Sequence, residues 1–428
     1  MPQAHTAATP AILGGTPVHS GKWPAWPPPL PAAEEHIDGV LQTRTWVRQS
    51  GHYTIDFEKA FAAKLGVRQA LTVCSGTAAL NCMMHGFEIG PGDEVLVTPY
   101  TFHSGATIPL MNYALPIFVD IDADSLQMDP AAISERVGPN TRAMVVCHWG
   151  GQAADMDGIM AAAQKHNIAV GEDAYQALFG TWHGRQLGSI GDIGVIGHHE
   201  NEILTCGEGA TLISNNEALI SLCYTWHDFG RDWEPGTHRI ATRAPWAHIG
   251  RNMKVMDVHG AVLLANLQRV EEWGKQRRAN ARRLRQLLAE IPGITMQKEY
   301  AGQEQGGYSQ LIFHYDRRHF NDLPREEFLR AVRAEGVPLG SFPGRPVSRE
   351  PYLEAKLSSP RFQKLYSQAQ LKRVRDSFEC PRADRACETA VNLQGRYLNA
   401  PDADITLIAE SIQKVQKHSV ALRERGAK

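Results

Sequence analysis

Short apolar segments alternate with helical segments from residue 57 to residue 173, and this alternation constrains the fold more than any other feature of the chain. The segments 70–73, 94–98, 116–120, 141–147 and 168–173 have strand-like composition, and helical patterns occupy 57–65, the stretch from 78, 104–111, 130–137 and 156–166. Strands and helices in alternation form βαβ units, which build a mostly parallel sheet covered on both faces. The sequence therefore predicts an α/β protein whose ligands bind at the carboxyl ends of the strands.

The length of 428 residues is more than one small core needs and predicts roughly two to three structural units. Gly and Pro are frequent at 10–33, which predicts an extended arm whose Trp23 and Trp26 need a surface of this subunit or of a neighbour. After a long helical segment at 256–290, strand-like and helix-like segments begin again. We expect an arm at 1–35, a large domain at 36–270 and a small α+β domain at 271–428.

Charge and composition favour a small-molecule substrate. The net charge is −2 and the isoelectric point is near 6.8, which gives no electrostatic reason to expect nucleic acid or an anionic membrane. The first 16 residues lack a basic segment followed by an apolar one, and no apolar run approaches about 18 residues, so we expect a cytoplasmic protein. The seven cysteines form no Cys-x-x-Cys pair, which predicts free thiols and no metal site.

A hydroxyl-rich turn follows the first strand of the alternation. Ser75, Gly76 and Thr77 precede a helical segment, and free amides at a helix start can bind a phosphate. An ordinary Ser/Thr helix cap is the commoner explanation of the same pattern. Asp173 ends a later strand and could pair with a protonated ring nitrogen, or it could cap a turn. Phe102 could stack on a planar ring or belong to the core.

The segment 195–210 has an apolar start, a dense polar turn and a glycine-framed end at Gly207 and Gly209. Polar side chains in such density point into a cleft more readily than into a core, because each unpaired buried group costs a few kcal/mol. An ordinary solvated turn remains the alternative.

The order of these motifs resembles the DegT/StrS group of fold-type I pyridoxal phosphate sugar aminotransferases. The opening segment 13–17 with 23–27 is most similar to the branch of the scyllo-inosose aminotransferases and 3-amino-5-hydroxybenzoate synthases. The resemblance implies an aspartate-aminotransferase-like fold and a soluble enzyme of sugar or aminocyclitol chemistry in antibiotic biosynthesis. It also assigns cofactor-binding roles to Ser75, Gly76, Thr77, Phe102, Asp173 and Gln176, and to Asn252 a role at the partner's site in a homodimer.

The chain departs from the family motif in the turn that follows 195. Alignment on Leu204 and 207–209 places Gly197 where the phosphate-binding serine belongs and Glu202 where the Schiff-base lysine belongs. A glutamate cannot form an imine, so ordinary transamination is not expected. Lys254 is the nearest lysine in motif terms but stands where the family has arginine.

The resemblance with these departures predicts an atypical enzyme that acts on a keto or amino sugar or an aminocyclitol. Pyridoxamine or pyridoxal phosphate would bind noncovalently, and Glu202 would act as acid or base. Two alternatives stay open: a catalytically silent partner of an active paralogue, and a cofactor-independent enzyme. The second would use Glu202, His198, His199 and Glu200 as an acid–base cluster. No metal is expected.

Overall fold

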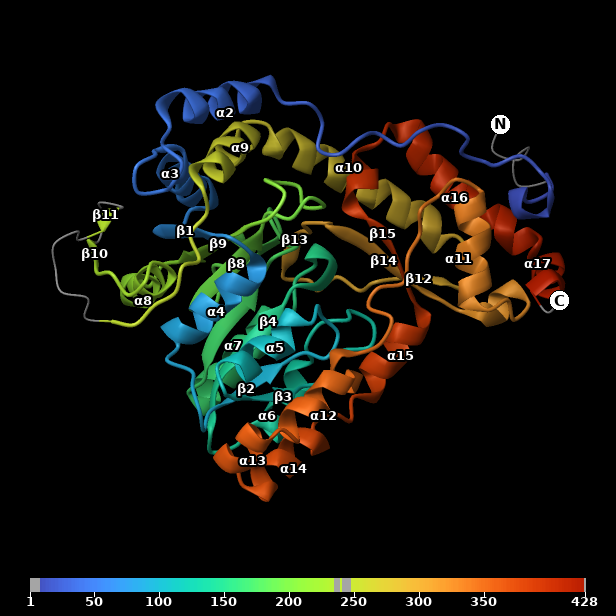
Figure 1. The fold of residues 1–428 in the computed structure, drawn as a ribbon. Coiled ribbons are helices and arrows are strands. Elements are labelled where there is room, and N and C mark those ends of the chain that lie inside the picture. The colour runs from blue at the N-terminus through green and yellow to red at the C-terminus, as the bar shows by residue number, and fades with distance from the viewer. Residues whose placement is uncertain (1–7, 235–238, 241–247, 427–428) are drawn as a thin grey trace.

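The computed structural model describes residues 8–234, 239–240 and 248–426. Its core is a seven-stranded sheet with the order β1-β9-β8-β5-β4-β2-β3 (Figure 1). The strands are β1 (Gln69–Val73), β2 (Glu94–Val97), β3 (Leu115–Phe118), β4 (Thr141–Cys147), β5 (Ala169–Asp173), β8 (Ile193–Gly197) and β9 (Ala210–Ser214). Only β9 runs antiparallel to its neighbours in this sheet, so the predicted mostly parallel sheet is confirmed.

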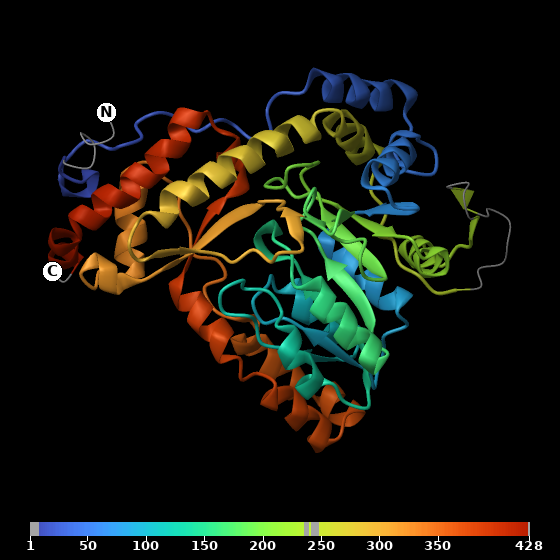
Figure 2. The ribbon, with the colours of Figure 1, turned by 180° about the vertical axis from the view of Figure 1, so that it is seen from behind.

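Helices cover both faces of this sheet (Figures 1 and 2). They are α3 (Tyr53–Leu65), α4 (Gly76–Gly86), α5 (Ser104–Met111), α6 (Pro130–Arg136), α7 (Met156–His166), α8 (Glu217–His227) and α9 (Asp257–Leu267). The helical segment expected at 256–290 is divided into α9 and α10 (Val270–Ala289). Along α10 the buried residues Trp273, Arg277, Ala281, Leu284 and Leu288 recur every three or four positions, which gives the helix one inward stripe.

A second, smaller sheet lies beside α10. It has the antiparallel order β12 (Ile294–Met296), β14 (Gln310–Tyr315), β15 (Ala390–Gln394). Helices α11 (Arg325–Ala334), α16 (Asp402–Lys417) and α17 (Ser419–Gly426) share a separate hydrophobic cluster with it. Short pairings join β13 (Gln303–Gln305) to β6 (Thr181–Trp182) and β7 (Arg185–Gln186), and β10 (Trp233–Glu234) to β11 (Arg239–Ile240).

Four helices of the last third of the chain pack against the main cluster instead of the second one. These are α12 (Pro351–Leu357), α13 (Pro360–Leu365), α14 (Gln368–Asp376) and α15 (Pro381–Thr389). They lie along the β3 edge (Figure 1), where the Phe118 amide donates to Ser377 Oγ at 3.1 Å. Residues after 270 thus contribute to both buried clusters, and the boundary at 270 stays a prediction.

The N-terminal arm lies on the surface of its own subunit. After a short 3₁₀ turn, Ala11–Leu13, it runs extended to α2 (Pro31–Thr43), which begins with proline at the first helical position. The Val18 amide donates to Glu335 Oε2 at 3.0 Å, and Trp23 Nε1 donates to the Gly336 carbonyl at 2.9 Å. Because Trp26 Nε1 donates to the carbonyl of Glu202 at 3.1 Å, the arm also reaches the turn after β8.

The cysteines are free thiols, as the sequence predicts, and five of the seven are buried. In the part of the chain that the structure describes, no helix is long and apolar enough to cross a membrane. The same residues contain no group of three potential metal ligands.

Candidate active site

A cavity of about 480 Å³ opens at the carboxyl ends of β1, β4, β5 and β8. Asp173 is the last residue of β5, and Gly76 starts the helix that follows β1. The opposite wall comes from the small sheet, through Ser309, Gln310 and Asn392. The cavity therefore lies where the alternation of strands and helices predicts a ligand site.

Asp173 presents a buried carboxylate to this cavity. Its side chain accepts one hydrogen bond, from the Tyr175 amide to Oδ1 at 3.3 Å, and only 7% of the residue is exposed. Burial raises the pKa of Asp173 to about 6, against the smaller opposite effects of the Tyr175 amide and His148. Neighbouring Gln176 is held in place because its Oε1 accepts the Gly150 amide at 2.9 Å.

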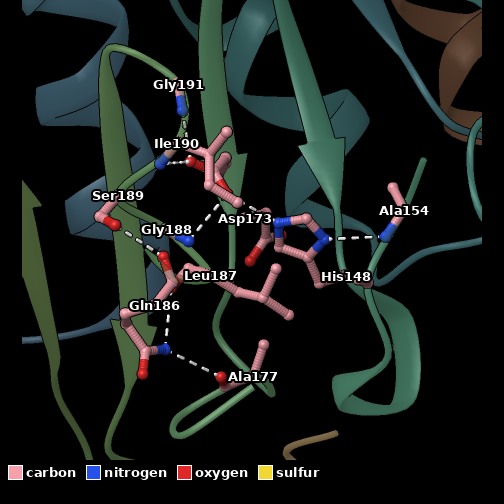
Figure 3. Close-up of polar contacts among 12 residues, drawn as sticks. His148, Ala154, Asp173, Ala177, Gln186, Leu187, Gly188, Ser189, Ile190 and Gly191 are labelled. Carbon is pink, nitrogen blue, oxygen red and sulfur yellow. Dashed lines mark hydrogen bonds and ion pairs between the residues drawn. The ribbon is translucent and has the colours of Figure 1, made fainter. Parts of the chain in front are cut away.

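Glu172, the residue before Asp173 in β5, ties this strand to the turn that contains Gly188 and Gly191, which Figure 3 labels. Glu172 accepts the amides of Gly188, Ile190 and Gly191 at 2.6 to 2.7 Å. The Ala154 amide donates to His148 Nδ1, so the proton is on Nε2, which donates to Glu172 Oε2 at 2.9 Å. Burial alone would raise the pKa of Glu172, but these donors hold it below its ordinary value.

Glu202 lies in the loop between β8 and β9 and is 7% exposed. Its Oε1 accepts the hydroxyl of Ser309 at 3.1 Å. Burial raises the pKa of Glu202 to about 7, and the charge of Asp173 acts in the same direction, while Ser309 and Arg277 oppose it. Near neutral pH this carboxyl can therefore give up or accept a proton, as a general acid or base must.

Arg277 of α10 is the cation whose charge lowers the pKa of Glu202. It is 1% exposed, its Nε donates to Asn399 Oδ1 at 2.9 Å, and its guanidinium lies 5.2 Å from the centre of the Trp26 ring. Its two terminal nitrogens are buried and have no hydrogen-bond partner among the described residues. Burial lowers the pKa of Arg277 to about 10.

The two histidines of the turn lie in different surroundings. His199 lines the cavity, and its Nε2 lies 3.8 Å from Glu208 Oε1. His198 is fully buried against Phe57 and Phe61, where Nε2 contacts Thr211 Oγ1 at 2.7 Å. Burial lowers its pKa to about 4. The expectation of a shared acid–base cluster is therefore corrected for His198. Successive side chains of an extended chain point to opposite sides, so His199 faces the cavity whereas His198 faces the core.

The remaining predicted residues divide between the cavity and the surface. Ser75, Gly76, Thr77, Phe102 and Gln176 line the cavity, and Phe102 is 54% exposed at its wall. Ser75 is also a helix cap, since its Oγ accepts the Ala78 amide at 3.1 Å. Three residues are not among the described residues that line this cavity: Asn252 and Glu200, which are exposed, and Lys254, which is ion-paired.

Several cavity residues escape sequence reasoning. Tyr175 and Glu208 stand inside motifs that the sequence singles out, and their polar character beside Asp173 and Glu202 is a signal that could identify them. Gln310 and Asn392 lie in β14 and β15, and Ser309 immediately precedes β14, all far along the chain. No local pattern marks them, because only the packing of the two sheets brings them to the cavity.

A model of the DegT/DnrJ/EryC1/StrS aminotransferase family matches residues 32–394. The chain belongs to this family. It is 31% identical to a putative L-glutamine:3-amino-2,3-dideoxy-scyllo-inosose aminotransferase of Micromonospora echinospora, over 97% of this chain and 98% of that protein. It is 30% identical to the L-glutamine:2-deoxy-scyllo-inosose aminotransferase of Streptoalloteichus tenebrarius, over 96% of this chain and 99% of that protein.

Solved structures of family relatives have the same fold. 3-Amino-5-hydroxybenzoic acid synthase is 26% identical, with a TM-score of 0.78, over 94% of this chain and 99% of that one. An aminotransferase from Psychrobacter cryohalolentis is 26% identical, with a TM-score of 0.79, over 91% and 98% of the two chains. These comparisons confirm the resemblance and the aspartate-aminotransferase-like fold that it implies.

The donor set of the cavity fits the pyridine ring of the family's cofactor. Asp173 is buried beside the cavity with one hydrogen-bond donor, and a buried carboxylate in that state is stabilised by a cationic partner such as a protonated ring nitrogen. Gly76 and Thr77, which begin α4, also line the cavity, and the start of a helix favours an anion. The cavity therefore has a place for the ring and a helix start for the phosphate.

Proposed function

We propose that this family member is an atypical enzyme that acts on a keto or amino sugar or an aminocyclitol in secondary-metabolite biosynthesis. The substrate class rests on the names of the scyllo-inosose aminotransferases that it resembles over almost its whole length. Pyridoxamine or pyridoxal phosphate binds without a covalent bond, because Glu202 stands at the position of the family's lysine.

In this proposal Asp173 pairs with the ring nitrogen, Phe102 and Gln176 contact the ring, and Gly76 and Thr77 offer backbone amides to the phosphate. The bound cofactor supplies an electron sink for carbon–nitrogen chemistry. Glu202 holds and moves a proton at its carboxyl oxygen. Ser309 orients that carboxyl by donating to Oε1 at 3.1 Å, and burial excludes water from it.

The observation that carries the proposal is the pair of buried carboxyls in one cavity. Their pKa values are raised to about 6 for Asp173 and about 7 for Glu202. Two carboxyls with different environments can take different roles, one as a counter-ion and one as a proton carrier. Asp173 at the strand end suits the first role, and Glu202 suits the second.

The test is a thermal melt with pyridoxamine phosphate at millimolar concentration. A ligand that binds only the folded protein raises its melting temperature, and Asp173→Ala should abolish that rise. Asp38→Ala, an exposed change on α2, is the matched control and should retain it. If neither cofactor form shifts the melt of the unmodified protein, the proposal is wrong.

The second candidate is a cofactor-independent enzyme that uses Glu202 and His199. It is supported by the absence of lysine and arginine among the described residues that line the cavity. A catalytically silent subunit paired with an active paralogue is the remaining possibility. In the leading proposal the partner is a second copy of this chain, whose cavity Asn252 would reach, and the exposure of Asn252 outside its own cavity supports this.

A further inference from the structure

The ring of Tyr175 fills the space between Gly76 and Gly197. A Cβ atom built on Gly76 would lie 2.5 Å from Cε2 of Tyr175, and one built on Gly197 would lie 2.2 Å from Cδ1. Both separations are far below van der Waals contact, so the ring rests directly on the two glycine backbones. A side chain at position 197, such as the serine of the family motif, has no room while Tyr175 is in this position.

Hydrogen bonds at both ends hold Tyr175 in place. Its hydroxyl donates to the carbonyl of Gly209 at 3.2 Å, and its own carbonyl accepts the amide of Gly197 at 3.0 Å. The ring therefore bridges from the start of α4 to the loop between β8 and β9, which is the end of the cavity that the proposed function gives to the phosphate.

The charges around this end are unfavourable for an anion. Asp173, Glu202 and Glu208 line the cavity, and no lysine or arginine lines it within the described residues. The carboxylates of Glu202 and Glu208 add to the effect of burial and raise the pKa of the Tyr175 hydroxyl, so it stays neutral. A phosphate dianion placed here would meet carboxylates without a counter-charge from this subunit's cavity wall.

We infer that Tyr175 closes the phosphate end of the cavity and makes this chain select against the phosphate of its ligand. This rests on the proposed function, which identifies that end of the site. A ligand phosphate reaches the amides of Gly76 and Thr77 only after the Tyr175 ring has left Gly197. The phosphorylated cofactor should then bind more weakly than it would if the Tyr175 ring were absent.

The experiment measures dissociation constants by calorimetry for pyridoxamine phosphate and for pyridoxamine. Tyr175→Ala removes the ring from the phosphate end of the cavity. The Tyr175→Ala protein should therefore bind pyridoxamine phosphate at least about tenfold more tightly than the unmodified protein, with pyridoxamine affinity nearly unchanged. Tyr175→Phe is the matched control, because it retains the ring and loses only the bond to Gly209. Its affinity for pyridoxamine phosphate should stay within about twofold.

The outcomes separate this inference from the proposed function. Binding of pyridoxamine phosphate by the Tyr175→Ala protein alone would support the inference and defeat the proposed function. Equal affinities in all three proteins would support the proposed function and overturn the inference. Binding by none of them would overturn both.

Glu208→Gln provides a variant that does not depend on how well Tyr175→Ala folds, because the Glu208 side chain is 66% exposed. It removes one negative charge from the same end of the cavity. Tighter binding of pyridoxamine phosphate with unchanged binding of pyridoxamine supports the inference. Unchanged binding of both ligands by this variant counts against the charge argument.

Discussion

The hydroxyl of Ser309 donates to Oε1 of Glu202 at 3.1 Å across the boundary between the two sheets. Ser309 immediately precedes β14 of the small sheet, and Glu202 lies in the loop that joins β8 to β9 of the large one. The protonation of Glu202 therefore depends on how the two parts of the molecule pack.

Glu202→Gln should change the pH dependence of stability. Burial raises the pKa of Glu202 from 4.5 to about 7, so the folded state binds this proton more tightly than the unfolded state. The stabilisation is present below pH 4.5 and is lost as the pH rises toward 7. Glutamine does not titrate, so the free energy of unfolding of the variant, relative to that of the unmodified protein, should rise by at most about 3 kcal/mol over this range. Urea unfolding at pH 5 and pH 8 measures the free energy of unfolding of both proteins. A difference between the two proteins that is the same at both pH values would contradict the raised pKa of Glu202.

The same variant should lose turnover on a sugar or cyclitol substrate. Removal of a general acid or base typically costs about a hundredfold or more in rate, whereas the similar shape of glutamine should leave KM nearly unchanged. Ser309→Ala is the companion variant: it keeps the carboxyl and should shift the pH profile upward, since the Ser309 bond lowers the pKa of Glu202. Full activity of Glu202→Gln would limit Glu202 to a structural role.

Covalent attachment of pyridoxal phosphate should be absent. The cavity lining contains no lysine among the described residues, and Lys254 is held by Asp228 and lies 4.3 Å from the centre of the Phe229 ring. After borohydride treatment, mass spectrometry should find no lysine that carries a pyridoxyl group. Glu202→Lys is the positive control, and modification should then map to position 202. A modified Lys254 in the unmodified protein would refute the noncovalent proposal.

Gly197→Ala should destabilise the protein because its Cβ would lie 2.2 Å from the Tyr175 ring. Overpacking of this kind costs about 1–3 kcal/mol in free energy of unfolding. In a Tyr175→Ala background the same change should cost much less, which a double-mutant cycle measures. Gly90→Ala, where an added Cβ has nothing within 4 Å, serves as the control. Equal costs in both backgrounds would show that the ring does not occupy this space.

Assembly as a homodimer should be visible by light scattering. The proposal uses Asn252 at the partner's cavity, and a subunit has exposed apolar side chains, such as Trp46 at 45% and Ile249 at 85%, that an interface would cover. Asn252→Ala should weaken pyridoxamine phosphate binding without changing the mass. A stable monomer would remove the shared site, and assembly only with a paralogue would favour the silent-subunit alternative.

Sequence periodicity predicts most of the large sheet. The helices at 104–111 and 156–166 and the strand at 141–147 have the predicted bounds. A strand buried on both faces and an amphipathic helix such as 156–166 each leave a local pattern. The break between α9 and α10 and the packing of α12–α15 with the main cluster have no such pattern. Each depends on contacts between segments far apart in the chain.

At the site, the sequence by itself determined which chemical groups stand at the strand ends: Asp173, the Gly76 turn and the Glu202 turn. Only the tertiary structure decided which of them share a cavity. It places His198 on the core side of the turn and brings Ser309 to Glu202. It also lays Tyr175 across Gly197. The physical reason is that residue type is local information, whereas burial, hydrogen-bond partners and the pKa shifts that follow from them arise from packing between distant segments.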